Sequence, residues 1–282
     1  MNKSTLAQLL YLLITTTFCA YLAYESWGQS VAYEHRISEL SDKLSMTDNF
    51  KSKSKKLLEV ITFSWYSGYE EELEALNAVK AQAERHDQLS AKYTKLFVAT
   101  LVLMFLIHVF LQSKISLLAL LSVTIMALVT GWFAPILAIV AYQDVPVLGQ
   151  TVFQFESKSI VSALQKLYES GQTVIALVIF LFTILTPVLK SIMLLVVLFS
   201  QNLHFSQRSI QVLKAIGKWS MLDVFVIAIL VTYFTTKSGG ATDATLQIGV
   251  FYFVAYVIAS MILTYLINVK NHVNQTSHSN IS

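Results

Sequence analysis

The chain has 282 residues, of which 55% are hydrophobic and only 13% charged, with a net charge of +3 at pH 7 and a mean hydropathy of +0.60. Soluble globular domains carry about 25% charged residues, so this composition excludes an ordinary soluble fold and indicates a membrane protein. The single cysteine, Cys19, excludes internal disulfides and any zinc site built from a cysteine pair, and we expect it to be a buried core residue.

Six stretches are long and apolar enough to cross a bilayer, which takes about 20 apolar residues in a helix. They are residues 5–24, 96–112, 115–142, 173–201, 219–236 and 246–269. We therefore predict an all-α polytopic membrane protein with about six transmembrane helices. The first stretch is expected to remain as an uncleaved anchor, because the bulky Tyr21 stands where signal-peptide cleavage needs a small residue.

Between the first two spans lies the only strongly charged part of the chain. Its apolar residues recur at helical spacing in two runs, Tyr33, Ile37, Leu40 and Leu44, then Leu73, Leu76, Val79 and Ala83. This pattern predicts a helical hairpin, or three helices, outside the membrane that rises from the first span and leads back into the second. Two roles stay open for it: a solvated spacer or subunit contact, or a ligand-sensing domain.

The positions of lysine and arginine predict the orientation, since short loops rich in these residues stay in the cytoplasm. An even number of spans places both termini on one side. If that side is the cytoplasm, it is faced by six basic residues near span ends, which are Lys3, Lys114, Arg208, Lys214, Lys218 and Lys270. Only three face outwards, which are Lys158, Lys166 and Lys237. Both termini are therefore expected in the cytoplasm.

The connection between the third and fourth spans has a different residue pattern from the spans themselves. Residues 145–155 alternate and are rich in β-branched and aromatic side chains, which predicts a short strand pair that turns near Gly149. Residues 159–170 carry apolar side chains at helical spacing and predict a small amphipathic helix at the outer interface. Residues 246–249 fall on the same side, so a small β element is expected there.

These features divide the chain into five expected parts. They are residues 1–27, a first anchor; 28–92, an outer helical domain; 93–113, a second transmembrane helix; 114–270, a four-span domain; and 271–282, a disordered cytoplasmic tail.

Two ionisable residues stand inside apolar spans, where they are expensive and usually face the bundle interior with a partner. Lys190 lies in the fourth span and Asp223 in the fifth, so we predict that they pair, directly or through Ser191, Ser220 or water. The alternative is that both side chains reach back to the cytoplasmic interface.

Pro187, three residues before Lys190, should bend the fourth span, because proline cannot donate to the carbonyl of Thr183. The hydroxyls of Thr183 and Thr186 are expected to occupy that acceptor. A bend lined by polar groups suits a passage or a hinge.

Motifs for common chemistry are missing from the sequence. It has no glycine-rich phosphate loop, no His-Glu-x-x-His pair, no Cys-x-x-Cys and no serine elbow. We therefore expect no enzyme, no catalytic residue, no cofactor, no metal site and no nucleic-acid partner.

Three segments resemble the paraquat-inducible protein A family: the run from Trp219 to Phe225 (Trp-Ser-Met-Leu-Asp-Val-Phe), the run from Thr186 to Lys190 (Thr-Pro-Val-Leu-Lys), and the polar connection that contains Gly149. The resemblance covers the last four spans. It implies an inner-membrane protein of Gram-negative bacteria that moves lipids across the cell envelope beside a periplasmic protein of the mammalian cell entry class. A transport site is then expected at Thr183, Thr186, Pro187, Lys190, Trp219, Ser220, Met221 and Asp223.

The chain departs from the better-known members of that family in two respects. Those members repeat the four-span unit and carry cysteine-pair metal ribbons, whereas this chain has one unit and one cysteine. Two extra spans and the outer helical region stand in their place. Three functions stay open: envelope lipid transport with membrane lipids as cargo, a membrane sensor or signalling scaffold, and an ion-coupled small-molecule permease that uses Lys190 and Asp223.

Overall fold

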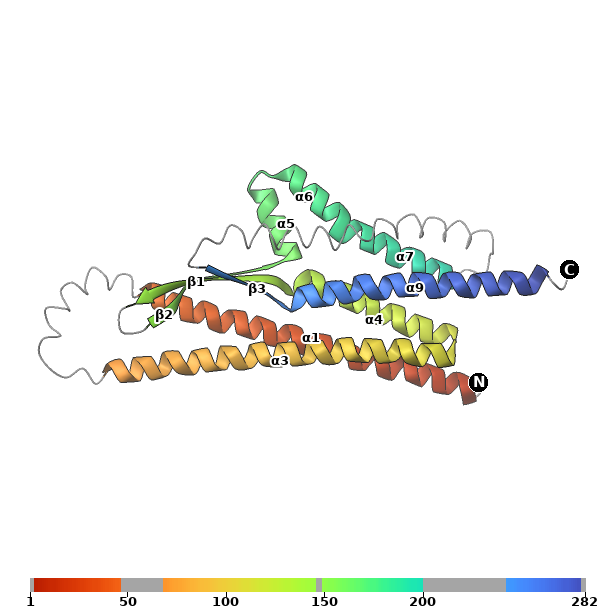
Figure 1. Cartoon of the computed structure of the whole chain (residues 1–282), viewed down its shortest axis with the longest axis horizontal. Helices are drawn as coiled ribbons and strands as arrows, with labels where there is room; N and C mark the ends of the chain where they lie inside the picture. Colours follow the sequence, from red (N-terminus) through yellow and green to blue (C-terminus); the bar gives the residue numbers. More distant parts are fainter. Residues whose placement is uncertain (1–2, 47–67, 146–148, 200–241, 280–282) are drawn as a thin grey trace, which may run out of the picture.

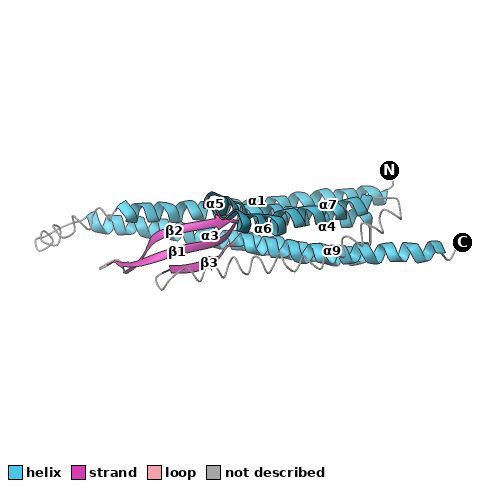
Figure 2. Ribbon diagram, turned by 90° about the horizontal axis from the view of Figure 1, so that it is seen from above, coloured by secondary structure: helices cyan, strands magenta, loops and turns pink. Residues whose placement is uncertain are grey.

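The computed structural model describes residues 3–46, 68–145, 149–199 and 242–279. Long helices run side by side in an elongated bundle, and a small sheet lies toward one end of it (Figures 1 and 2). Within the described residues, five helical segments are long and apolar enough to cross a membrane, which confirms a multi-pass helical membrane protein. The expected span 219–236 lies outside the described residues.

Two antiparallel helices, α1 (Lys3–Met46) and α3 (Gly68–Leu111), form the predicted hairpin and also contain the first two candidate spans. Each helix continues without a break through the boundary that the sequence suggested, at residues 27/28 and 92/93, so those domain limits stay predictions. The residues that join the two helices, 47–67, are outside the described part of the chain.

Small hydroxyl residues let α1 and α3 approach closely. The hydroxyls of Ser26 and Thr94 lie 2.7 Å apart, and both side chains also donate to the carbonyl of Ser90. Buried hydroxyls with such partners bring two membrane helices together where large side chains would separate them. The rings of Phe97 on α3 and Tyr252, 4.9 Å apart, then join this hairpin to the last helix.

A tight turn connects α3 to α4 (Lys114–Phe133). Gln112 has a φ of 43°, in the left-handed region that often ends a helix. The side chain of Ser113 then accepts the amide of Ser116 and caps α4. His108 lies buried with its Nδ1 2.6 Å from the Ser116 hydroxyl.

The predicted third span, 115–142, is too long at its C-terminal end. Helix α4 stops at Phe133, and Pro135 begins strand β1 instead of bending a helix. The residue before a proline is pushed out of the helical region, and Ala134 has an extended conformation with a ψ of 148°. The apolar run after Pro135 is therefore a buried strand.

The small sheet confirms the predicted β element and extends it. Strand β1 (Pro135–Val145) pairs antiparallel with β2 (Gly149–Ser159) on one side and with β3 (Thr242–Leu246) on the other. A helix, α5 (Ile160–Glu169), follows β2 directly and is capped by Ser159, as the amphipathic pattern predicted. The sheet touches α1 through a hydrogen bond from Ser157 to the Glu34 carboxylate.

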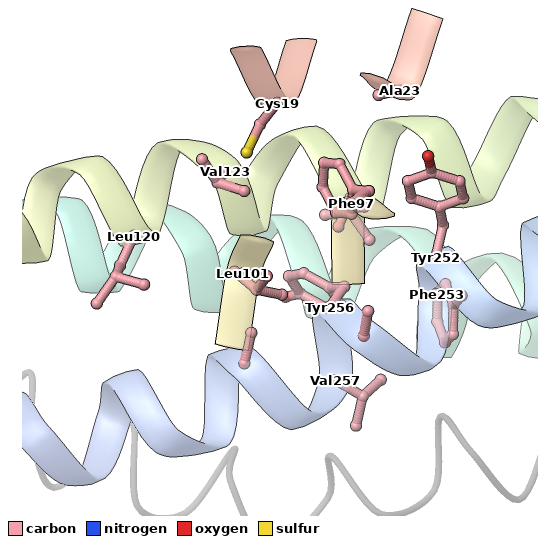
Figure 3. Close-up of a cluster of buried hydrophobic side chains, with 14 of the residues drawn as sticks. Cys19, Ala23, Phe97, Leu101, Leu120, Val123, Tyr252, Phe253, Tyr256 and Val257 are labelled. Carbon is pink, nitrogen blue, oxygen red and sulfur yellow. The ribbon is translucent and has the colours of Figure 1, made fainter. Parts of the chain in front are cut away.

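Of the two remaining described spans, the first is built from three pieces, α6 (Thr173–Phe180), a π-helical turn η1 (Leu181–Leu185) and α7 (Thr186–Phe199). Helix α9 (Ile248–Ser279) follows β3 and completes the bundle. Apolar side chains from α1, α3, α4 and α9 meet in one core, which includes Cys19 as expected (Figure 3). Leu194 and Val197 of α7 also belong to this core.

Two glycines have opposite surroundings, one packed against backbone and one open, and substitutions at them test the packing of the bundle. A Cβ on Gly249 would lie 2.5 Å from the carbonyl oxygen of Ala134 and 2.6 Å from that of Pro135, whereas a Cβ on Gly28 would meet nothing within 4 Å. Gly249→Ala should destabilise the fold by about 1–3 kcal/mol because backbone must move. Gly28→Ala, in the middle of α1, should stabilise it by about 0.5–1 kcal/mol. Thermal unfolding in detergent would measure both, and equal effects would contradict the close approach at Gly249.

A second prediction concerns the joint between β2 and α5. The Lys166 ammonium, bonded to Glu156, holds the pKa of that carboxyl below its usual value of 4.5, and Lys158 at 3.3 Å acts in the same direction. Since the folded pKa is lowered, this stabilisation is present above pH 4.5 and is lost as the pH falls through the lowered pKa. Amide hydrogen exchange should show weaker protection of the joint in Glu156→Gln than in the wild type at about pH 7 and no difference at about pH 2. Glu169→Gln is the control for removing an exposed carboxylate, and a difference that persists in acid would contradict the ion pair.

Candidate functional site

The span from Thr173 to Phe199 is irregular at its centre. Within η1 the backbone makes i to i−5 hydrogen bonds, so that the amide of Thr186 donates to the carbonyl of Leu181. The Thr186 hydroxyl donates to the same carbonyl at 2.9 Å. Pro187 follows at once. A π turn beside a proline is a recognised cause of helix bending and is frequent at functional sites.

The carbonyl that Pro187 leaves without an amide partner is satisfied from another helix. The indole Nε1 of Trp132, near the end of α4, donates to the Thr183 carbonyl at 2.8 Å. The prediction that threonine hydroxyls fill this position is wrong: the Thr183 hydroxyl donates to Ile179, and that of Thr186 donates to Leu181. Threonine hydroxyls in helices bond to carbonyls on the preceding turn, which leaves the freed acceptor to an outside donor.

Contact with α9 holds the helix that carries Trp132 in place. Gly131 lies against the backbone of α9, where a Cβ would come within 2.9 Å of the Phe253 amide nitrogen. The small residue allows α4 and α9 to touch, as expected for close packing of membrane helices. Trp132, next along the chain, is thereby directed toward the bent span.

Lys190 is buried inside the bundle, with only 2% of its surface exposed. Its ammonium donates to the hydroxyl of Ser260 on α9 at 2.9 Å, and that hydroxyl donates in turn to the carbonyl of Val257. Lys190 lies nine residues before the end of α7, which is roughly 14 Å along the helix axis. Its side chain therefore points into the bundle and not toward the membrane interface.

A tyrosine one turn earlier on α9 extends the polar contact. The Tyr256 hydroxyl donates to the carbonyl of Pro187 at 2.9 Å and lies 3.4 Å from the Ser191 hydroxyl. Tyr256 and Ser260 are four residues apart, so they share one face of α9 and meet the polar face of α7. We call the group Trp132, Thr183, Pro187, Lys190, Tyr256 and Ser260 the Pro187 site.

The structure brings half of the predicted site residues together. Thr183, Thr186, Pro187 and Lys190 lie around the bend. Trp219, Ser220, Met221 and Asp223 lie outside the described residues, so the pairing of Lys190 with Asp223 stays a prediction.

Sequence reasoning missed three members of the site, Trp132, Tyr256 and Ser260. A signal existed for two of them, because Tyr256 and Ser260 are polar residues at i and i+4 in an otherwise apolar span. For Trp132 the only available signal was the general rule that a buried indole N–H finds a hydrogen-bond acceptor.

Chemically, the Pro187 site is a set of donors on a bent helix within the membrane. A buried ammonium attracts anions, and a span that contains a π turn beside a proline is a common place for a membrane helix to bend. The fold and the site together define a multi-pass membrane protein with a kinked span around a buried lysine.

The family model for paraquat-inducible protein A matches residues 117–274, which is more than half of the chain. The chain therefore belongs to the paraquat-inducible protein A family. All six residues of the Pro187 site lie inside the matched region, whereas α1 and α3 precede it.

A relative in Haemophilus influenzae, described as a probable intermembrane transport protein, is 29% identical over 112 residues. The match covers 38% of this chain and 26% of the relative, so it spans about a quarter of the relative's length. No solved structure matches the chain.

A double-mutant cycle with Pro187 tests the hydrogen bond from Trp132 to the Thr183 carbonyl. Trp132→Phe should cost about 1 kcal/mol, within the range for bonds between membrane helices. Pro187→Ala restores an amide that is able to bond the Thr183 carbonyl, so the cost of Trp132→Phe should fall toward zero in that background. Unfolding in mixed detergent and SDS micelles measures the four free energies.

The control cycle replaces Pro187→Ala with Leu189→Ala, since Leu189 is exposed on the same helix. This cycle should be additive. Additivity in the Pro187 cycle as well would mean that the indole and the proline are not coupled.

Proposed function

We propose that this protein is a non-enzymatic component of lipid transport across the envelope of a Gram-negative bacterium. It would lie in the inner membrane with both termini in the cytoplasm, and with the sheet and the outer ends of α1 and α3 in the periplasm. Membership of the paraquat-inducible protein A family supports this proposal, and so does the transport role in the name of the Haemophilus influenzae relative.

The observation that carries the proposal is the contact between Lys190 and Ser260. A lysine deep in an apolar span is expensive, and it is usually retained for a substrate or ion pathway. Here the ammonium is bonded to α9 while its own helix bends at Pro187 one turn away. A change in that bend would break the contacts to Ser260 and Tyr256 and present the ammonium to the phosphate of a lipid head group.

The arrangement of the helix ends supports the proposed orientation. The start of α1, the start of α4 and the end of α9 lie at one end of the bundle (Figure 1). That end carries Lys3, Lys114 and Lys270. The opposite end carries Lys158 and Lys166, both of which contact the Glu156 carboxylate. A larger number of basic residues is typical of the cytoplasmic side.

A periplasmic partner of the mammalian cell entry class is part of the same proposal. A transporter of a single small bundle needs another protein to carry lipid through the periplasm. The α1 and α3 hairpin runs beside the sheet, away from the ends that we place in the cytoplasm (Figure 1), and is the contact that we propose for such a partner.

An ion-coupled permease is the second candidate, because the closed surroundings of Lys190 also suit a site that takes up and releases a proton. The sensor function has weaker support, which is the unbroken course of α1 and α3 from the outer region into the bundle.

Phospholipid exchange between the two membranes tests the leading proposal. A strain without the gene would be pulse-labelled with radioactive acetate, and labelled phospholipid would be followed from inner to outer membrane. Lys190→Met should reduce the rate to that of the deletion strain, because the ammonium is lost while the length of the side chain is kept. Leu189→Met, on the exposed face of the same helix, should keep the wild-type rate.

Immunoblots of membranes would confirm equal insertion of the variants. A wild-type rate in Lys190→Met would reject the Pro187 site as the working element. An unchanged lipid rate together with a lost proton-driven uptake of a small solute would favour the permease.

A further inference from the structure

A lateral groove of about 330 Å³ runs between α1 and α4, on a different part of α4 from the indole of Trp132. Its lining is almost wholly apolar and comes from both helices: Ala20, Ala23, Tyr24 and Trp27 of α1, and Ile125, Met126, Val129, Thr130 and Phe133 of α4. The volume falls at the lower end of the range for small-molecule sites, about 300–1,000 Å³. Helix α1 lies outside the region that matches the family and α4 lies almost wholly inside it, so the groove forms between the family region and the part of the chain that precedes it.

The groove exists because α1 presents small residues beside its packed face. Cys19 points into the core (Figure 3), and Leu22 belongs to the same core, so both hold α1 in place. Ala20, one position along, is too short to fill the space beside them. The groove extends over seven residue steps of α1 and eight of α4, which is about 10–12 Å along the helix axes.

One side of the groove is open and continuous with the surface that faces the bilayer. Both helices are candidate membrane spans. Tyr24 is 68% exposed at the rim, and Val129 and Phe133 are also exposed there. The apolar surface continues along α1 to exposed residues such as Leu13. Whatever enters from this side comes from within the membrane.

The end of the groove near Trp27 and Phe133 lies where α4 gives way to the sheet. Tyr24 and Trp27 carry a polar tip on an apolar ring, which is the type of residue found where lipid tails meet head groups. The groove therefore opens to the leaflet on the sheet side, with its aromatic residues toward the head groups and its aliphatic residues toward the tails.

Binding energy in such a groove comes from shape. Lipid tails are as apolar as leucine, so a chain that leaves the bilayer for the groove gains no hydrophobic free energy. What it gains is dispersion contact with both helices at once. A site of this kind holds its occupant weakly and exchanges it readily.

We propose that this groove binds one acyl chain of a bilayer lipid from the leaflet on the sheet side. If the bound lipid is also the transported cargo, that part of the inference rests on the proposed function. The binding of the acyl chain does not depend on it. Thr130 in the groove and Trp132 at the Pro187 site are two residues apart on α4, so an occupied groove and the bent span share one helix.

Photolabelling tests the groove without a transport assay. The full chain would be reconstituted in vesicles of phosphatidylethanolamine and phosphatidylglycerol with a trace of phosphatidylethanolamine that carries a diazirine in one acyl chain. After illumination, labelled peptides are mapped by mass spectrometry. Label should be enriched in residues 20–27 and 125–133 over other exposed apolar segments such as 174–178. Equal labelling of all exposed apolar segments would overturn the proposal.

Variants that fill the groove sharpen the result. Ala20→Phe from α1 and Val129→Trp from α4 should each lower the label in the facing helix by about fivefold or more, whereas Leu13→Phe, at a position 62% exposed outside the groove, should leave it unchanged. Thermal unfolding would show that each variant is folded. Label that persists in both folded filling variants would also overturn the proposal.

A photoreactive amino acid at Val129 distinguishes the possible occupants. An adduct with lipid supports the proposal. A crosslink to residues 200–241 of the same chain, or to a second copy, would overturn it by identifying a protein segment in the groove. Loss of lipid exchange in Lys190→Met with normal groove labelling would separate the two sites. Normal exchange in the wild type without groove labelling would reject the groove and leave the proposed function standing.

Discussion

The hydrogen bond from the Trp132 indole to the Thr183 carbonyl is the interaction on which the working part of this bundle depends. Pro187 removes an amide from the middle of a membrane span, where an unsatisfied carbonyl has no water to accept from. The indole supplies the missing donor and, in doing so, ties the bent span to α4. Without an outside donor, the proline would leave a carbonyl without a hydrogen bond inside the membrane and would destabilise the span.

The bend decides what the next turn of the helix contacts. Pro187, Lys190, Ser191 and Leu194 all lie on the buried face of α7, and Lys190 and Ser191 are turned toward α9. On α9, Ser260 accepts a hydrogen bond from Lys190, and Tyr256 donates one to the carbonyl of Pro187. The opposite face of α6 and α7 consists of exposed aliphatic and aromatic residues suited to lipid. A single helix thus carries a polar seam toward its neighbour and an apolar surface toward the bilayer.

Much of this was readable in the sequence. Charge-free runs predicted the spans, alternation predicted β2, and the rule that proline removes a donor identified the Thr183 carbonyl in advance. The donor was not predictable, because Trp132 is 51 residues away and only the packing of α4 beside the bent span brings it there. The end of the third span was misjudged because the apolar run after Pro135 suits a buried strand as well as a helix, although a proline at the first strand position was a usable signal. Ser260 and Tyr256 became meaningful only when α7 was placed against them.

The two helices of the hairpin have a mechanical consequence. Each contains 44 residues, which makes it about 66 Å long at about 1.5 Å per residue, roughly twice the thickness of the hydrocarbon layer. A rod of that length, embedded over half its extent, is a lever. A sideways push on its far tip by another protein produces an opposite, comparable displacement at the other end of the helix, with the membrane as the fulcrum. Since α1 also forms one wall of the acyl-chain groove, a force applied well outside the bilayer would widen or narrow a space inside it.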